Sequence, residues 1–562
     1  MNAAGALRKR VTLVALAVAT ALTVGLGVGV TQAQAIDDDS GTIEVTGLES
    51  GVSVTAYQVI DVNYDFGSAD QPVDPVYVWD SAVASWVGTY YSSYIDTSDS
   101  SVTSTFQSLE ESGAQSFYDA LAAAIRGGTI SLKPAATGTA STEGTDGTYG
   151  TTLKDLDMGS YLLLFEGGEK VYQVSVVNVL PTWSDTDDDG TEDAWVQTTS
   201  TLKVKSSEPS ISKVISNSNG TNSDTSATVQ SAGIGETVSY TLTVTLPTYL
   251  TSAISDDFVI SDVLDDGLTV DTSTIKVYGT SVSDGTLITN GDTTYYTLTT
   301  TDGTTLVSDS ETAVDFQINL DYDAVTALGY TTIVVTYDAT VDSDAEPNVA
   351  YSNTAYLEYS NNPYGTSSSS TATYKVKTAA DTTAVYTYGI QLTKISASDS
   401  SVKLAGAQFT MTDSSSNTLY FKLDSTSGVY YYAGTSSGDD LTSTLESDSS
   451  GLITVYGLDT GSYTLAETKA PDGYSKLASS ISLVIADDDL DGQPTGTVDD
   501  TSVNESSGGL VSFNVSNTDA STFSLPTTGG IGTIIFTIAG VVLIAVAIAV
   551  FVGIRRRNRD EA

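Results

Sequence analysis

The stretch Tyr463-Thr-Leu-Ala-Glu467-Thr-Lys-Ala-Pro-Asp-Gly-Tyr474 joins an alternating strand pattern to a turn containing Asp-Gly. Side chains two residues apart in a strand lie on the same face, so Tyr463, Leu465 and Glu467 are expected to share one. Glu467 continues an apolar row and is therefore predicted to point into a core. A carboxyl group buried in that way needs a chemical partner.

The same alternation recurs through most of the chain. Runs rich in Thr, Val, Ser and Tyr, such as residues 236–244 and 332–337, lie between Asp-Gly, Asn-Gly and Gly-Ser pairs that form turns. This pattern predicts an all-β fold made of β-sandwiches. One helical stretch stands out, from Ser116 to Gly128, where the glycines are a stop signal.

Polar segments without bulky apolar residues mark the expected domain boundaries. They lie at Ser206-Ser-Glu-Pro and at Ala379-Ala-Asp-Thr-Thr-Ala. We therefore predict three modules, at 36–206, 207–383 and 384–522.

The first residues of the chain carry an export signal. Arg8-Lys9-Arg10 precede an apolar stretch, and Ala33-Gln34-Ala35 has the small-x-small pattern of a signal-peptidase site. Residues 1–35 are expected to be a cleaved signal peptide, so the mature chain is secreted.

The last residues predict an anchor. Leu525-Pro526-Thr527-Thr528-Gly529 precede an apolar run at 531–554 and a basic tail at 555–562. The run is long enough to cross a membrane as a helix, and the arginines fix its cytoplasmic end. This order resembles the cell-wall sorting signal (LPXTG) of Gram-positive surface proteins. The resemblance implies that a sortase cuts between Thr528 and Gly529 and passes the Thr carbonyl to an amine. An ordinary membrane anchor after a Leu-Pro turn is the alternative.

Composition excludes several classes of protein. Asp and Glu number 70 against 22 Lys and Arg, giving a net charge of −48, which repels phosphate backbones and makes a nucleic-acid partner unexpected. The chain has no Cys for disulfides and no His for general-base or metal chemistry. An exported hydrolase is therefore the least favoured class, and we do not expect an enzyme.

Residues 467–474 resemble the E-box, E-T-x-A-P-x-G-Y, of the collagen-adhesin B-type (Cna-B) domain. The resemblance implies tandem immunoglobulin-like β-sandwich (Cna-type) domains. It also implies that Glu467 assists an amide bond between a Lys on the first strand and an Asn on the last. Side-chain alternation supports Lys394, which follows Ile390 and Leu392, and Asn517, which follows Val511, Phe513 and Val515.

Burial would favour this reaction. A buried Lys394 sheds its proton and can attack the side-chain carbonyl of Asn517. Protonated Glu467 can polarise that carbonyl and pass a proton to the departing ammonia. The alternative is a buried ion pair between Lys394 and Glu467, with Asn517 an ordinary turn residue.

The middle module has a similar pattern with a different acid. Residues 262–268, Asp-Val-Leu-Asp-Asp-Gly-Leu, resemble the D-x-L-x-x-G-L segment of the isopeptide-forming domain in pilus backbones. We predict a bond between Lys213 and Asn353, with Asp262 as the acid, because each continues an apolar row. Asn348 is close enough to compete, and a surface position for all of them is the alternative. The apolar rows are Ile211 and Ile215; Phe258 and Ile260; and Val349, Tyr351 and Ala355.

Residues 195–206 resemble the pilin-motif region of backbone subunits, which follows a Trp and ends in V-x-V-Y-P-K-N. Aligning that end makes Lys205 the acceptor of the next subunit, although the Tyr, Pro and Asn of the motif are absent. Leu202 and Val204 share one face, which leaves Lys203 and Lys205 on the other, exposed one. Lys203 is the alternative acceptor, and two solvated strand lysines are the simpler interpretation.

Two loops have the D-x-D-x-D-G form that suits Ca²⁺. They contain Asp185, Asp187 and Asp189, and Asp487, Asp489 and Asp491. Neither has Glu at the twelfth position, where Val196 and Val498 stand, so chance acidic turns are the alternative. No cofactor is expected to be required, and the first loop is the candidate calcium site.

Together these features predict the major subunit of a covalently polymerised pilus on the cell wall. Its expected partners are a pilin-polymerising sortase, a wall-anchoring sortase, identical subunits, minor or tip pilins, and peptidoglycan. An ancillary pilin or a single wall-anchored adhesin that binds a host ligand is the alternative, since it would share every feature except an acceptor lysine.

Overall fold

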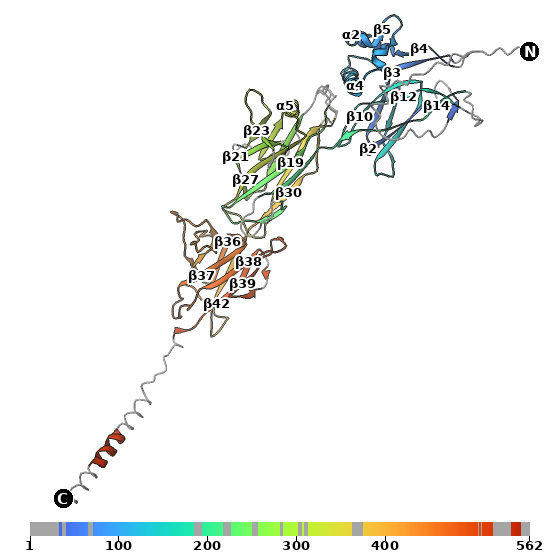
Figure 1. The fold of residues 1–562 in the computed structure, drawn as a ribbon. Helices are drawn as coiled ribbons and strands as arrows, with labels where there is room; N and C mark the ends of the chain where they lie inside the picture. Colours follow the sequence, from blue (N-terminus) through green and yellow to red (C-terminus); the bar gives the residue numbers. More distant parts are fainter. Residues whose placement is uncertain are drawn as a thin grey trace, which may run out of the picture.

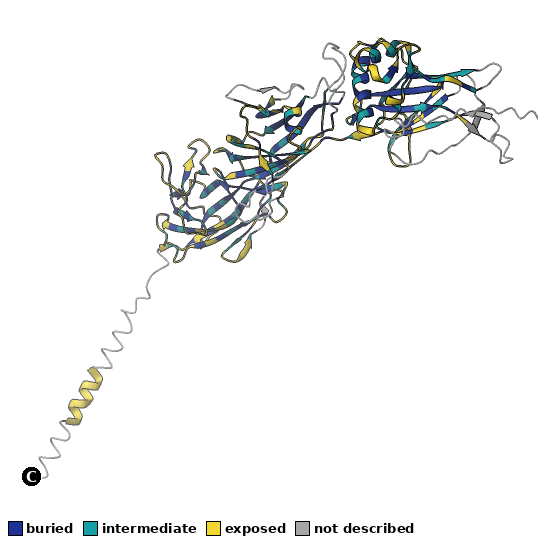
Figure 2. Ribbon diagram, turned by 45° about the horizontal axis from the view of Figure 1, so that its top comes forward, coloured by how far each residue is buried: buried dark blue, intermediate teal, exposed yellow. Residues whose placement is uncertain are grey.

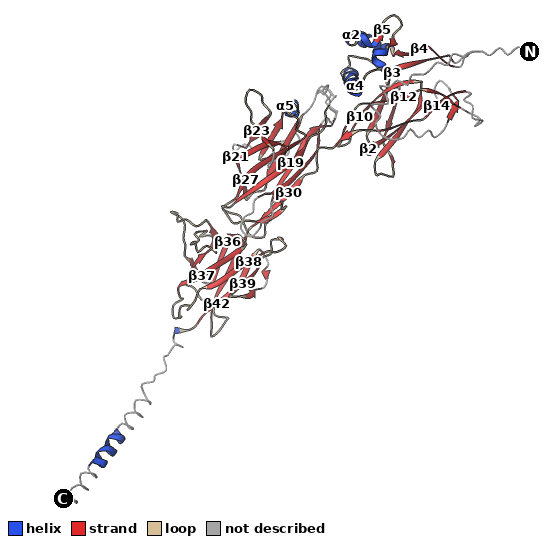
Figure 3. Cartoon of the chain, in the orientation of Figure 1, coloured by secondary structure: helices blue, strands red, loops and turns tan. Residues whose placement is uncertain are grey.

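The computed structural model describes three β-rich modules that follow one another along an elongated molecule (Figure 1). The described residues are 33–35, 41–65, 71–184, 194–216, 226–249, 257–280, 285–301, 306–307, 313–361, 375–503, 505–506, 508–520 and 541–551. Within them most residues of the modules lie in strands, and helices gather in the first module (Figure 3). The predicted all-β fold is confirmed.

The first module is a sandwich with an additional helical layer. A seven-stranded sheet, in the order β12-β10-β3-β4-β6-β5 with β7 beside β3, faces a four-stranded sheet in the order β15-β2-β9-β8. The elements are β1 (Ala33–Ala35), β2 (Gly41–Leu48), β3 (Ser53–Asp65), β4 (Gln71–Trp79), α2 (Ser81–Tyr90), η1 (Ser92–Tyr94), β5 (Ile95–Asp96), β6 (Ser101–Val102), α3 (Ser104–Gln107), α4 (Glu111–Arg126), β7 (Ala136–Thr139), β8 (Thr142–Glu143), β9 (Tyr149–Leu156), β10 (Gly159–Glu166), β11 (Val171–Tyr172), β12 (Ser175–Val179), β13 (Pro181–Ser184), β14 (Ala194–Thr198), β15 (Ser200–Lys203) and β16 (Ser206–Ser207).

Strand β10 explains why this module needs helices. Its residues are buried on both faces: Tyr161 and Leu163 pack in the sandwich core, whereas Leu162 and Leu164 pack against the helical side. A strand covered on both faces loses the alternation of apolar and polar residues. The predicted helix at 116–128 is confirmed as part of α4, which covers this second face.

Helix α2 was not predicted, because its Ser, Val, Thr and Gly residues are weak helix formers. The Asp80 side chain accepts a hydrogen bond from the Ala82 N–H at 2.7 Å and caps its first turn. Val83 and Val87, one turn apart, are buried against the core. Tertiary packing and the cap therefore outweigh local propensity.

The middle module is a two-layer sandwich around one core. Its sheets run β17-β19-β27-β21-β22 and β18-β30-β28-β20-β26-β23, with β29 beside β28. The elements are β17 (Ser210–Ile215), β18 (Val229–Ser231), β19 (Thr237–Thr245), β20 (Phe258–Leu264), β21 (Leu268–Gly279), β22 (Thr286–Leu287), β23 (Tyr296–Thr300), β24 (Leu306–Val307), β25 (Ala313–Val314), β26 (Phe316–Leu320), α5 (Tyr322–Thr326), β27 (Thr332–Val341), β28 (Tyr351–Ser360), β29 (Lys375–Lys377) and β30 (Asp381–Tyr386).

The third module is a second two-layer sandwich, with sheets β33-β34-β36-β31-β42-β41 and β35-β32-β37-β38-β39-β40. Its strands carry buried residues, coloured dark blue in Figure 2, which form one core. The elements are β31 (Tyr388–Ser396), β32 (Gln408–Thr412), β33 (Phe421–Leu423), β34 (Val429–Tyr432), β35 (Leu445–Glu446), β36 (Leu452–Leu458), β37 (Gly461–Lys469), β38 (Ile481–Ala486), β39 (Thr495–Val498), β40 (Thr501–Val503), β41 (Glu505–Ser506) and β42 (Leu510–Asn517).

Hydrogen bonds join successive modules. Between the first two, the Asn361 side chain donates to the Gly168 carbonyl at 2.8 Å. Between the last two, Ile234 N–H donates to the Gly457 carbonyl at 2.9 Å, and the Ile234 side chain fills the space that a Cβ at residue 457 would need. The predicted boundary at 383 lies inside β30, which ends at Tyr386 in the middle module.

Parts of the predicted leader and anchor lie outside the described residues, namely 1–32, the sorting motif 525–529 and the basic tail 555–562. Of the predicted transmembrane helix at 531–554, residues 541–551 are helical. No helix within the described part of the chain is long and apolar enough to cross a membrane. The spanning helix and the signal peptide remain predictions.

Candidate cross-linking sites

The structure brings Lys213, Asp262 and Asn353 together in the core of the middle module. Lys213 lies on β17 in one sheet, whereas Asp262 on β20 and Asn353 on β28 lie in the facing sheet. All three have no exposed surface. The alternation of each strand points these side chains inward, as predicted, so the surface alternative for them is wrong.

Short distances connect the three side chains. The Lys213 amine Nζ lies 2.6 Å from Asp262 Oδ2 and 2.5 Å from Asn353 Oδ1. The amine, the amide carbonyl and the carboxyl therefore form one contact set in which a proton can pass between Nζ and the carboxyl. Lys213 and Asn353 also span the two sheets, so a bond between them would join both layers.

Tyr337, on β27, completes this set and was not predicted. Its hydroxyl accepts hydrogen bonds from Lys213 Nζ at 2.7 Å and from Asn353 Nδ2 at 2.9 Å, and donates to Asp262 at 3.0 Å. Alternation along residues 332–337 places it on the core face, but only the fold brings it to Lys213. The hydroxyl fixes the Asn353 amide with its carbonyl toward the amine.

Burial dominates the electrostatics of this site. Burial lowers the pKa of Lys213 to about 8. The charge of Asp262 acts in the opposite direction and raises this pKa, but its effect is smaller. Burial also raises the pKa of Asp262, against the opposing effect of Lys213. Both shifts favour a neutral amine beside a protonated carboxyl, which are the forms needed for attack on an amide. Burial raises the pKa of Tyr337 as well, so its hydroxyl keeps its proton.

Lys394, Glu467 and Asn517 form a second buried set in the third module. Their exposed fractions are 0%, 4% and 1%, so all three predicted inward positions are confirmed. Lys394 on β31 and Asn517 on β42 lie on adjacent parallel strands, where Lys394 is opposite Val515 and Ser396 is opposite Asn517. Glu467 on β37 reaches them from the facing sheet.

Contacts in this second set are looser around the lysine. Lys394 Nζ lies 3.7 Å from Glu467 Oε1 and donates to the Val515 carbonyl at 3.1 Å. Burial lowers the pKa of Lys394 to about 8, against the effect of Glu467. Glu467 Oε1 and Asn517 Oδ1 are buried without a hydrogen-bond partner among the described residues. A buried oxygen that accepts no hydrogen bond is costly, so a hydrogen-bond donor that reached either oxygen would stabilise this site.

The E-box turn holds the glutamate and the asparagine in place. Asn517 Nδ2 donates to Glu467 Oε2 at 2.9 Å and to the Ser475 carbonyl at 2.7 Å. Leu477 N–H donates to the same carboxyl oxygen at 2.7 Å. The segment after the turn therefore supplies the backbone groups that orient Glu467 and Asn517.

One detail of the prediction for the middle module is wrong, and the alternative asparagine lies elsewhere. Val349 was expected to share the buried row but is 39% exposed, because β28 begins only at Tyr351. The rival Asn348 lies before the strand with φ +62°, and its side chain accepts a hydrogen bond from Gln493 of the third module. Asn353, and not Asn348, is the amide beside Lys213.

Lys203 and Lys205 are exposed beside the junction of the first two modules. Their side chains are 60% and 48% exposed, whereas Leu202 and Val204 are buried, as alternation predicted. Lys203 Nζ pairs with Asp146 at 2.9 Å, and Lys205 Nζ lies 3.8 Å from Glu111. Lys205 is therefore the less tightly held of the two amines.

Asp185, Asp187 and Asp189 lie outside the described residues, so their calcium site remains a prediction. The second loop, at 487–491, is described.

Two protein families match the C-terminal part of this chain. Residues 389–499 match the SpaA family, a prealbumin-like fold domain. Residues 517–561 match the LPXTG cell wall anchor motif. The protein therefore has a SpaA-type domain followed by a cell-wall anchor, and the predicted cell-surface location is confirmed.

Several solved structures of pilins are similar to this chain. The T6 backbone pilin of serotype M6 Streptococcus pyogenes, which has a modular three-domain structure, is 18% identical over 86% of this chain and 100% of that one, with a TM-score of 0.54. The major pilins SpaD and SpaA of Corynebacterium diphtheriae are both 16% identical, covering 86% and 85% of this chain and 99% and 100% of theirs, with TM-scores of 0.46 and 0.42. Comparison with curated protein sequences gives no match. The likeness to the T6 pilin supports the observed all-β fold.

Tyr337→Phe tests the hydroxyl that organises the middle-module site. The change removes the hydrogen bonds that the hydroxyl makes with Asp262 Oδ1 and Asn353 Nδ2, while both residues keep Lys213, so we expect the free energy of unfolding to fall by about 1–3 kcal/mol. Thermal unfolding of the chain from Ile36 to Thr528 measures it. Tyr356→Phe is the matched control, since the buried Tyr356 hydroxyl has no hydrogen-bond partner among the described residues. Equal effects of the two changes would contradict the assigned role.

Proposed function

We propose that this protein is the backbone subunit of a sortase-assembled pilus. A sortase would join the Thr528 carbonyl of one subunit to the Lys205 amine of the next, with Lys203 as the alternative acceptor. The observation that carries the proposal is the exposed Lys205 at the start of two modules that each bury a lysine, an acid and an asparagine. The cell-wall anchor and the fold shared with the T6 backbone pilin support it.

In the middle module, we propose that Lys213 and Asn353 condense. Neutral Nζ bonds to the Asn353 side-chain carbon, and the bond from that carbon to Nδ2 breaks. Nδ2 leaves as ammonia with its own two hydrogens and one from the amine, which the Asp262 carboxyl transfers. The contacts of Lys213 with both partners support this assignment.

In the third module, the same condensation would join Lys394 to Asn517 with Glu467 as the acid. The hydrogen bond from Asn517 Nδ2 to Glu467 supports this role, because the acid already contacts the leaving group. Each reaction occurs once per molecule. The chain therefore modifies itself and serves as a sortase substrate, and we do not propose that it is an enzyme.

These bonds would give the subunit a continuous covalent path for force. Tension entering at Lys205 would pass from Lys213 directly to Asn353, then from Lys394 directly to Asn517, and leave at Thr528. The strands between each pair would carry little load. The first module lies outside this path, which is consistent with the absence of a predicted cross-link there.

An ancillary pilin or a single wall-anchored adhesin is the second candidate. The sequence around Lys205 favours this second candidate, because the Tyr, Pro and Asn expected around an acceptor lysine are absent. Such a protein would keep the anchor and the internal bonds but would not form a polymer through Lys205.

Lys205→Ala tests the proposed polymer. In cells that express the polymerising sortase, wall-released native protein should give a ladder of SDS-resistant species on an immunoblot, and the variant should give monomer. Lys203→Ala is the matched control and should keep the ladder. A ladder that persists in Lys205→Ala and collapses in Lys203→Ala would move the acceptor. No ladder in any of the three would favour the adhesin.

Intact mass tests the internal bonds independently of polymerisation. Each bond lowers the mass by about 17 Da, the mass of ammonia lost in the condensation. We expect the chain from 36 to 528 to be lighter by two ammonia molecules than its sequence requires. Lys213→Ala and Lys394→Ala should each lose one of these decrements and unfold at lower temperature. An intact mass equal to the sequence mass would contradict both bonds.

A further inference from the structure

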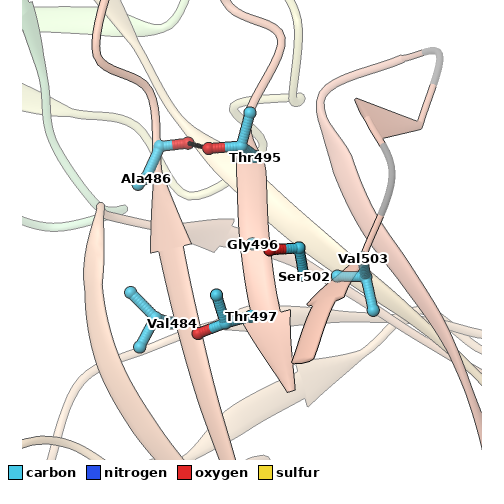
Figure 4. Close-up of a pocket in the computed structure, with 7 residues that line it drawn as sticks. All are labelled: Val484, Ala486, Thr495, Gly496, Thr497, Ser502 and Val503. Carbon is cyan, nitrogen blue, oxygen red and sulfur yellow. Dashed lines mark hydrogen bonds between the residues drawn. The ribbon is translucent and has the colours of Figure 1, made fainter. Parts of the chain in front are cut away.

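An acidic loop at residues 487–494 lies where the third module meets the middle one. It connects β38 to β39, and the Thr495 hydroxyl donates to the Ala486 carbonyl at 3.3 Å across its base (Figure 4). The hollow shown beside this base is lined by Val484, Thr497, Val503 and neighbours without charged groups. The charge is concentrated in the loop itself.

Three carboxylates of this loop converge. One oxygen each of Asp487, Asp489 and Asp491 lies within 4.8 Å of the other two. Oxygen ligands of Ca²⁺ lie about 2.3–2.6 Å from the ion, so two ligands of one ion are separated by at most about 5 Å. The three oxygens are therefore close enough to share a single cation. Within the described part of the chain, no Lys or Arg forms an ion pair with any of these three carboxylates.

Asp487 provides a second, independent indication of a ligand. Only 8% of it is exposed, and its Oδ2 accepts hydrogen bonds from the Tyr388 hydroxyl at 2.8 Å and the Gly492 N–H at 2.9 Å. Its Oδ1 is buried with no hydrogen-bond partner among the described residues. A buried, unpaired carboxylate oxygen beside two more acids is costly unless a cation is bound.

The loop also contacts the connection between the modules. Gly492 has φ +85°, and a Cβ there would lie 2.7 Å from the Tyr386 ring at the end of the middle module. Next to it, the Gln493 side chain donates to Asn348 of the middle module. Tyr388, which holds Asp487, begins the first strand of the third module. An ion bound to the three acids would thus fix a loop that touches both modules.

We propose that Asp487, Asp489 and Asp491 bind Ca²⁺ and that the ion stiffens the junction between the middle and third modules. Carboxylates with an irregular loop suit Ca²⁺ better than Mg²⁺, which demands near-octahedral geometry and keeps its water. Sites of this kind in extracellular modules have dissociation constants of about 10⁻⁴–10⁻³ M. The site does not depend on polymerisation, so it stands apart from the proposed pilus function.

Calorimetric titration with CaCl₂ tests the site in the chain from 36 to 528. Asp489→Asn/Asp491→Asn removes two exposed ligands and leaves the buried Asp487 intact. We expect the native chain to bind Ca²⁺ and the double variant to bind at least tenfold more weakly. Asp185→Asn/Asp187→Asn is the matched control for the other acidic loop and should retain this binding.

Thermal unfolding gives the second readout. CaCl₂ should raise the unfolding temperature of the native chain above that in MgCl₂ at equal ionic strength, and the double variant should lose the difference. Equal effects of the two salts would indicate charge screening and overturn the proposal. It would also be overturned if the native chain showed no binding, or if only the control variant lost it.

Discussion

The structure depends on one constraint that occurs at two points, namely a lysine amine buried in a β-sandwich core beside a carboxyl and an amide. Moving an isolated charge into a protein core is costly, so such a group is paired, neutralised or consumed. Burial lowers the pKa values of Lys213 and Lys394 and raises that of Asp262. In the middle module an amide oxygen lies 2.5 Å from the amine, and we propose that condensation with this amide removes the buried charge.

The same chain uses lysine in two opposite ways. Lys213 and Lys394 are fully buried on strands whose inner faces are apolar, whereas Lys205 lies on the outer face of a segment whose inner face is Leu202 and Val204. Lys205 lies between β15 and β16, on the side opposite to the buried Val204, whereas Lys213 and Lys394 point inward from strands. The buried amines can react only within their own module, while the exposed amine is available to another molecule.

Strand alternation made much of the fold and of both core sets predictable from sequence. It gave the inward positions of Lys213, Asp262 and Asn353, and of Lys394, Glu467 and Asn517, because period two is a local property. It failed at Val349, where the strand starts later than expected, and at α2, where packing outweighs propensity. Tyr337 and the contact between Gly492 and the middle module could not be predicted, since both depend on segments distant in sequence.

Single-molecule stretching of the chain between residues 205 and 520 tests the central claim most directly. Lys213 and Asn353 are 140 positions apart in the sequence, and if they are bonded, the segment between them stays closed under load. The account predicts that this segment gives no unfolding step in the native chain. In Lys213→Ala a step of roughly 460–500 Å should appear, at about 3.3–3.6 Å per extended residue. A step of that length in the native chain would contradict the covalent path.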